Sequence, residues 1–155
     1  MRHLFRLLIL IFATITPPAL ADEIDDILAG DTAPAGIVFE VVSDQEDLLK
    51  DVLPAIGNDI KRLRKRFPEL DIAIVTHGDE QFALTTDHRE KDPKLHAIAQ
   101  TLVDDEQVSM HVCATYAAWN GVSVEEFAEF VDVSATGPAQ INDYRALDYI
   151  VIMLP

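Results

Sequence analysis

Three side chains in this sequence have types and spacing that suit chemistry at one place: Cys113, His77 and His111. Cys113 is the only cysteine, and it ends the short apolar run 108–113, whose β-branched residues favour a buried strand. The Ala-rich segment that follows, closed at residues 120–121 by Asn-Gly, predicts a short helix. At such a junction the cysteine meets unpaired backbone N–H groups, which favour the nucleophilic thiolate.

Each candidate also has a plainer interpretation. A lone cysteine at a strand end is often a small buried hydrophobe. His111 lies two residues before Cys113 on the same strand face, where it either supports the thiolate or serves as a hydrogen-bonded core histidine. His77 ends another strand and is a possible partner at the rim. We expect His96 to lie on the surface.

Known motifs favour neither a metal site nor the common enzyme classes. The sequence lacks H-E-x-x-H and C-x-x-C, so a metal held by His77 and Cys113, with Asp79 or His88, is a weaker alternative. It also lacks G-x-S-x-G, a P-loop and G-x-G-x-x-G, which argues against an ordinary hydrolase, an NTPase and a dinucleotide enzyme. We expect no cofactor. The acidic residues are dispersed, which suits solubility better than paired-carboxylate catalysis.

Composition places the chain among acidic globular proteins of one domain. It has 155 residues and a net charge of −15, and phosphate neutralisation needs clustered basic residues, so a nucleic-acid partner is not expected. One basic cluster exists, at Lys61, Arg62, Arg64, Lys65 and Arg66. It is interpreted as a solvated helix end, with a docking patch for an acidic partner as the alternative.

The first residues predict export. Arg2 and Arg6 precede the apolar run 7–15 and an Ala-x-Ala site, so residues 1–21 are interpreted as a signal peptide cleaved after Ala21. We therefore expect a periplasmic protein without a membrane span after cleavage, an uncleaved anchor being the alternative. An odd cysteine in such a compartment suggests a free thiol or an intermolecular pair. Residues 22–35 are expected to form an N-terminal arm with one helical turn.

Strands and helices alternate through the expected domain, residues 36–155. This order and the near-continuous apolar strands predict a three-layer α/β/α fold with a mostly parallel five-stranded sheet. His77 and Cys113 both fall at strand carboxyl ends, where functional groups gather in such sheets. The expected strands are 37–42, 70–77, 108–113, 131–134 and 149–154, and the expected helices are 43–67, 92–102, 114–119 and 137–147, with another after Ser123.

Local signals add three expectations. Ser43 and Glu46 have the spacing of a capping box at the start of the first long helix. Pro54 should kink or restart that helix, because its ring clashes with the carbonyl four residues earlier. Residues 79–91 are weakly patterned and are expected to be a loop with at most a short helical turn.

The segment 113–122, CATYAAWNGV, resembles the DsrE/DsrF/TusD-like family of sulfur-relay proteins, in which a strand ends in a cysteine that an Ala-rich helix follows. Asn58, the strand end 75–78 and the closing residues 147–155 also fit an uncharacterised branch of that family. The resemblance covers residues 36–155. It implies a three-layer α/β/α fold, often assembled into trimers or hexamers.

The resemblance also implies a role for Cys113. The matching cysteine of the relay members carries sulfur as a persulfide between a donor and an acceptor protein. Because the signal peptide predicts export, the expected setting here is thiosulfate or sulfide metabolism, with small sulfane-sulfur compounds as further partners. The alternative is a non-enzymatic exported domain, for ligand binding or oligomeric assembly, whose cysteine is structural.

Overall fold

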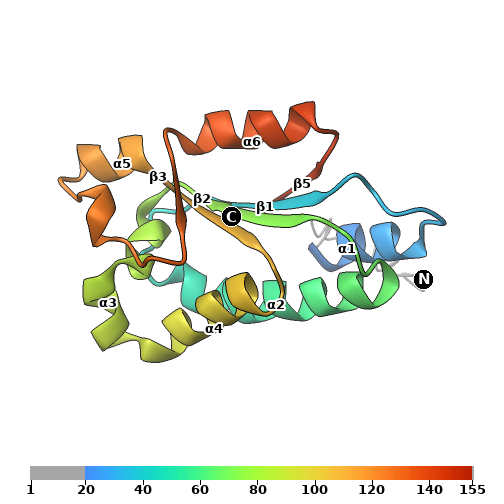
Figure 1. Ribbon diagram of the computed structural model, residues 1–155, viewed down its shortest axis with the longest axis horizontal. Coiled ribbons are helices and arrows are strands. Elements are labelled where there is room, and N and C mark those ends of the chain that lie inside the picture. Colours follow the sequence, from blue (N-terminus) through green and yellow to red (C-terminus); the bar gives the residue numbers. More distant parts are fainter. Residues whose placement is uncertain (1–19, 155) are drawn as a thin grey trace, which may run out of the picture.

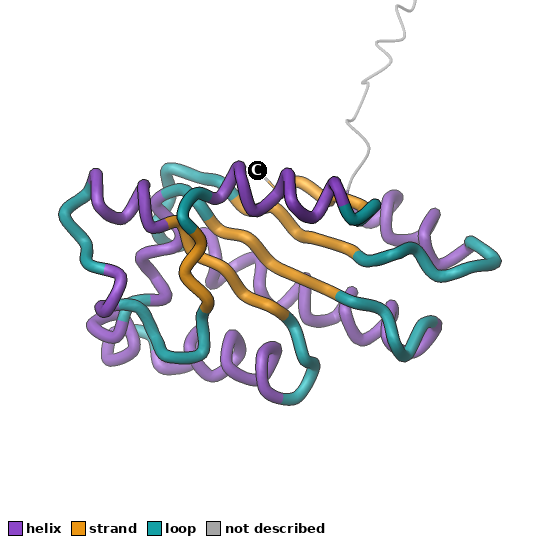
Figure 2. The backbone as a smooth tube through the Cα atoms, turned by 45° about the horizontal axis from the view of Figure 1, so that its top comes forward, coloured by secondary structure: helices purple, strands orange, loops and turns teal. Residues whose placement is uncertain are grey.

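The computed structural model describes residues 20–154 and is built on one sheet of five parallel strands (Figure 2). The strand order is β4-β3-β2-β1-β5, and every neighbouring pair is parallel. The expected three-layer fold is confirmed, and the sheet is parallel throughout. The strands are β1 (Ile37–Val41), β2 (Ile72–Thr76), β3 (Ser109–Cys113), β4 (Asp132–Ser134) and β5 (Ile150–Leu154).

Helices cover both faces of the sheet (Figure 1). One face carries α1 (Leu20–Ala29), α2 (Leu48–Arg66), α3 (Thr86–Lys91) and α4 (Pro93–Asp104). The other is covered by α6 (Gly137–Ala146), and α5 (Ala114–Trp119) lies at the end of the molecule beyond β3. The connection from β4 to β5 leads from one edge of the sheet to the other, and α6 contacts β1, β2, β3 and β5 on the way.

The two faces differ in what they bury. The larger core lies on the α2 and α4 face, where alternate strand residues such as Phe39, Ile74 and Val112 are fully buried. The core under α6 is small and consists of Val38, Ala73, Val75 and Ile141. Other strand positions on this face are polar, such as Glu40 and Ser109, and His111 and Cys113 of β3 are among them, whereas His77 directly follows β2.

The N-terminal arm is more ordered than expected. Instead of a single turn, it forms the ten-residue helix α1, which packs against α2 and β5. Ile24 is fully buried, and Asp25 pairs with Arg62 of α2. The expected signal peptide lies, up to residue 19, outside the described residues. Within residues 20–154 no helix is both long and apolar enough to cross a membrane.

The first long helix begins later than predicted. It starts at Leu48 after Asp47, and the Ser43–Glu46 capping box is absent. The reason is that both residues bind elsewhere: the Ser43 N–H donates to Glu80, and Glu46 lies 3.1 Å from His88 Nε2. The helix does not restart at Pro54, because its apolar face remains buried on both sides of the proline.

Residues 79–91 were wrongly expected to be mainly a loop. They form the 3₁₀ helix η1 (Asp79–Leu84) and then α3. Apolar periodicity is weak here because η1 buries two polar side chains, Glu80 and Gln81. After Ser123 the predicted helix is only the 3₁₀ turn η2 (Val124–Glu126), although the Ser123 N–H does donate to the Glu126 carboxylate at 2.7 Å.

We predict that α1 contributes directly to stability. Ile24→Ala removes a fully buried side chain between α1 and the core, and should lower the free energy of unfolding by about 2–5 kcal/mol. Leu147→Ala, at a side chain that is 61% exposed, is the control and should change it by less than about 0.5 kcal/mol. Urea unfolding of both variants measures the difference. Equal effects would show that α1 does not pack as described.

Candidate functional site

Cys113 ends β3 and caps α5. Its Sγ accepts a hydrogen bond from the Tyr116 N–H at 3.3 Å, so the sulfur takes the place of the usual hydroxyl or carboxylate cap. The residue is a free cysteine and is only 4% exposed. The expected junction of strand, cysteine and short helix is therefore present, with a thiol that is covered.

Gln81 holds the backbone of Cys113 from the other side. The Cys113 N–H donates to Gln81 Oε1 at 2.7 Å, and Gln81 is completely buried in η1. The ladder between β2 and β3 ends at the pair Val75 and His111, so Gln81 supplies the acceptor where the neighbouring strand has turned away. A glutamine in a weakly patterned segment gave no sequence signal for this role.

Glu80 ties together the loops that follow β1 and β2. Its carboxylate accepts hydrogen bonds from the N–H groups of Ser43 (2.8 Å), His77 (3.0 Å) and Gly78 (3.0 Å). Burial raises the pKa of Glu80 above its ordinary value, although these hydrogen bonds favour the ionised form. The interpretation of the acidic residues as dispersed solubilising groups is wrong for Glu80 and for Glu40, which is 7% exposed.

Gly78 allows the chain to approach closely at this point. A Cβ on Gly78 would lie 2.3 Å from the carbonyl oxygen of Ser43 and 2.5 Å from Glu80 Oε2. The Asp79 N–H in turn donates to that Ser43 carbonyl at 2.7 Å. A side chain here would therefore push apart the two loops that Glu80 joins.

His77 is paired with a buried carboxylate beneath α6. Its Nε2 lies 3.0 Å from Glu40 Oε1 in β1. Glu40 Oε2 has no hydrogen-bond partner among the described residues, and Arg145 of α6 lies 3.7 Å from it. The ring also packs against Gly137, where a Cβ would lie 2.3 Å from the Cβ of His77. The Gly137 contact holds the start of α6 on the sheet, and Arg145 belongs to the last turn of that helix.

His111 is a hydrogen-bonded core histidine, the second of the two interpretations above. Its Nε2 lies 2.8 Å from the Tyr144 hydroxyl, and its Nδ1 lies 3.2 Å from Ser134 Oγ. The Ser134 hydroxyl donates its hydrogen to Gln140 Oε1, so the Ser134 oxygen accepts a hydrogen bond from His111 Nδ1. His111 Nε2 then carries no hydrogen and accepts from the Tyr144 hydroxyl. Burial lowers the pKa of His111, so the ring is neutral and adds no positive charge near Cys113.

The side chains of His77 and Cys113 have different partners and are not bonded to each other in the structure. Both lie at the carboxyl-end edge of the sheet, but His77 binds Glu40, whereas the Cys113 thiol faces the first turn of α5. The other suggested metal ligands are also engaged, Asp79 by the Tyr116 hydroxyl at 2.7 Å and His88 by Glu46. Among residues 20–154 no group of three His, Cys, Asp or Glu residues is arranged to hold a metal ion.

His96 is buried rather than on the surface. It is 3% exposed, and its Nε2 lies 3.0 Å from the carbonyl oxygen of Ala83. Its ring meets Phe130 edge-on, with 6.0 Å between centroids. The prediction was wrong because η1 and the segment before β4 cover the polar side of α4, which sequence periodicity does not show.

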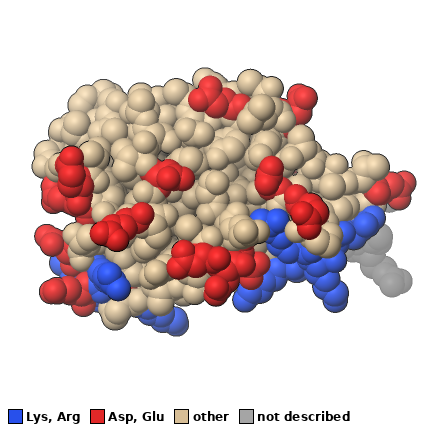
Figure 3. Space-filling view, in the orientation of Figure 1, with Lys and Arg blue, Asp and Glu red and all other residues tan. Residues whose placement is uncertain are grey.

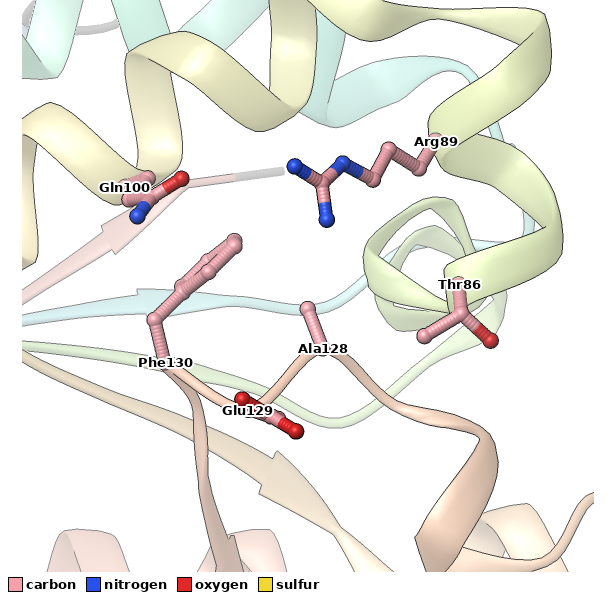
Figure 4. Close-up of a pocket in the computed structure, with 6 residues that line it drawn as sticks. All are labelled: Thr86, Arg89, Gln100, Ala128, Glu129 and Phe130. Carbon is pink, nitrogen blue, oxygen red and sulfur yellow. The ribbon is translucent and has the colours of Figure 1, made fainter.

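Two of the surface hollows border α3, and Cys113 lines neither of them. One of about 450 Å³ has the Arg89 guanidinium directed between Phe130 and Gln100, with Glu129 in its wall (Figure 4). The other, of about 520 Å³, includes Asp79 and has more acidic than basic residues in its lining. Its lining includes Asp44, Glu46, Asp79, Asp87, His88, Lys91 and Glu126.

The three arginines of the basic cluster bond to other groups of the same chain. Lys and Arg side chains gather at the carboxyl end of α2, while acidic groups are spread over the rest of the visible face (Figure 3). Arg62 bonds Asp59 and Asp25, Arg64 donates to the carbonyls of Pro68 and Glu106, and Arg66 donates to that of Gly30. The contacts of the arginines agree with the interpretation as a helix end.

Comparison with known proteins identifies a fold but no family. No family model and no curated protein matches the sequence. A similar solved structure is MTH1491 from Methanobacterium thermoautotrophicum, described as a protein of unknown function. It is 18% identical with a TM-score of 0.58, over 76% of this chain and 97% of that one. This likeness supports the α/β architecture alone.

We predict that the close approach at Gly78 is required for stability. Gly78→Ala should lower the free energy of unfolding by about 1–3 kcal/mol, because its Cβ meets backbone and a fixed carboxylate. Gly57→Ala is the matched control: its Cβ would lie 3.5 Å from Leu102 inside α2, and alanine favours a helix by up to about 1 kcal/mol. Chemical denaturation should move the two variants in opposite directions.

A second prediction concerns pH. Burial lowers the pKa values of His111 and His96 below the ordinary 6.5, so below this pH the unfolded chain binds more protons than the folded one. The contribution of these two histidines to the free energy of unfolding should therefore fall as the pH drops from 7 to 5, whereas the raised pKa of Glu80 acts in the opposite direction. His111→Gln removes one of these groups and should make the fall smaller. An unchanged slope in urea titrations of the variant would contradict the neutral, buried imidazole.

Proposed function

We propose that this protein is an exported sulfur carrier that holds sulfane sulfur as a persulfide on Cys113. One observation carries the proposal: the only cysteine ends a central strand, and its sulfur accepts a backbone N–H from the first turn of α5. The thiolate is the form of a cysteine that attacks sulfane sulfur, and the Tyr116 N–H is a hydrogen-bond donor already directed at this sulfur.

The resemblance of segment 113–122 to the DsrE/DsrF/TusD-like family supports the same chemistry. In this proposal the thiolate attacks the outer sulfur of a donor and later passes it to an acceptor. The donors are proteins or small sulfane-sulfur compounds of thiosulfate or sulfide metabolism. The proposed setting is the periplasm after removal of residues 1–21, with the protein assembled as a homo-oligomer of the trimeric or hexameric kind found in the family.

The surroundings of the thiol restrict which donors reach it. Because Cys113 is 4% exposed, a donor must be small and extended, or must displace a covering segment. His77 and His111 are engaged with Glu40, Tyr144 and Ser134, so they enter this proposal as residues that shape the sheet edge.

Burial of the thiol favours a second candidate function. In it, the chain is a non-enzymatic exported domain for ligand binding or assembly, and Cys113 serves as the structural cap of α5. The two candidates differ in one respect: only a carrier gains and loses a sulfur atom at Cys113.

The test is a mass measurement. Purified protein incubated with polysulfide or thiosulfate should gain one sulfur atom, and dithiothreitol should remove it. Cys113→Ser, which keeps a hydrogen-bonding cap, should gain none. A thiol titration after denaturation checks that Cys113 is still reduced. If the reduced protein forms no adduct with any donor, the carrier function is refuted and the structural candidate is favoured.

A further inference from the structure

Gln81 presents an unused hydrogen-bond donor beside Cys113. The Cys113 N–H can only donate, so the amide atom 2.7 Å from it must be the Gln81 oxygen. This orientation fixes the opposite end of the amide as the NH₂ group. Within residues 20–154, Gln81 Nε2 is buried and has no hydrogen-bond partner.

An unsatisfied NH₂ group at a fully buried side chain is costly, and such groups usually have a partner in the working state of a protein. The two outer atoms of an amide are about 2.2 Å apart, which places Gln81 Nε2 within about 5 Å of the Cys113 nitrogen. The missing partner is thus a hydrogen-bond acceptor that lies close to Cys113.

The Cys113 thiol is not bonded to this group: its sulfur accepts the Tyr116 N–H, and Gln81 Nε2 has no partner among the described residues. A persulfide adds a second sulfur about 2 Å beyond Sγ, and that outer sulfur carries the negative charge when the group ionises. It places a hydrogen-bond acceptor beyond the capped Sγ, among the groups that cover Cys113.

We propose that the Gln81 NH₂ group receives the anionic outer sulfur of a persulfide on Cys113. This inference rests on the proposed function and assigns Gln81 as the residue that stabilises the loaded form. The donor class is a small organic persulfide, R–S–SH. The Cys113 thiolate attacks its outer sulfur, the new S–S bond forms as the old one breaks, and the electron pair leaves with R–S⁻.

That step transfers sulfur without net oxidation or reduction. The proton remains on the transferred sulfur until the Cys113 persulfide ionises, and then passes through solvent to the departing thiolate. Ionisation leaves a full negative charge on the outer sulfur. A hydrogen bond to a charged group is stronger than one to a neutral group, so the Gln81 NH₂ favours the ionised persulfide over its protonated form.

The charged and titratable groups around this position are otherwise engaged. Glu80, next to Gln81 in η1, accepts three backbone N–H groups. Asp79 accepts from the Tyr116 hydroxyl of α5, and His111 of β3 is bound to Tyr144 and Ser134. Loss of the Gln81 NH₂ therefore leaves the outer sulfur without an obvious replacement among these groups.

The experiment loads the full chain with glutathione persulfide and follows the near-ultraviolet absorption of the persulfide anion as a function of pH. Gln81→Met has a similar length and no charge, and Gln81→Glu keeps the acceptor for the Cys113 N–H but lacks the donor. In both, the pH midpoint for ionisation should rise by about one unit, a tenfold change in the ionisation constant. Gln100→Glu, an exposed position on α4, is the control and should match the wild type.

The possible outcomes separate the role of Gln81 from the sulfur-carrier function itself. A wild-type midpoint in both Gln81 variants, with the adduct present, refutes the role of Gln81 and leaves the sulfur carrier intact. A shift in Gln81→Glu alone shows charge repulsion and also refutes it. If the wild-type protein forms no adduct, the proposed function fails, and the role of Gln81 fails with it. Circular dichroism of each variant confirms that a shift comes from a folded protein.

Discussion

The arrangement of this site depends on one buried carboxylate. Glu80 accepts N–H groups from the loop after β1 and from the end of β2, so a single side chain joins two neighbouring strand ends. These loops have few apolar side chains to pack, and hydrogen bonds to a charged acceptor replace that packing. The contact is possible only because Gly78 lets the backbone and the carboxylate approach. The contact also fixes the position of η1. The residue after Glu80 in η1 is Gln81, whose side-chain oxygen accepts the Cys113 N–H.

The two faces of the sheet differ in the kind of contact that holds their helices in place. The face toward α2 and α4 buries continuous apolar side chains and accounts for most of the core. The face toward α6 has only a small apolar cluster, and there polar contacts attach the helix: His77 packs on Gly137, and His111 bonds Tyr144. A fold with one strongly packed face can hold a buried histidine such as His111 on the other, because the apolar face supplies the free energy that its desolvation opposes.

Patterns that repeat along the chain predicted the fold, whereas contacts between distant residues determined the site. Apolar strands alternating with helices were sufficient for the three-layer architecture and for placing Cys113 between β3 and α5. The capping box at Ser43 failed because Glu80, 37 residues away, binds the Ser43 N–H. Glu80, Gln81 and His96 look like surface residues in sequence, and only the tertiary packing of η1 buries them. No local period encodes such a contact.

The thiol is the feature whose role matters most, and its state in the living cell tests that role most directly. The measurement is the intact mass of the protein isolated from cells that produce it with the leader, with thiols blocked at lysis and no sulfur donor added afterwards. If Cys113 carries sulfur, a fraction of the molecules has one extra sulfur atom, which peptide analysis locates at Cys113 and dithiothreitol removes. If cells grown on thiosulfate or sulfide yield only the blocked free thiol, Cys113 is not a sulfur carrier.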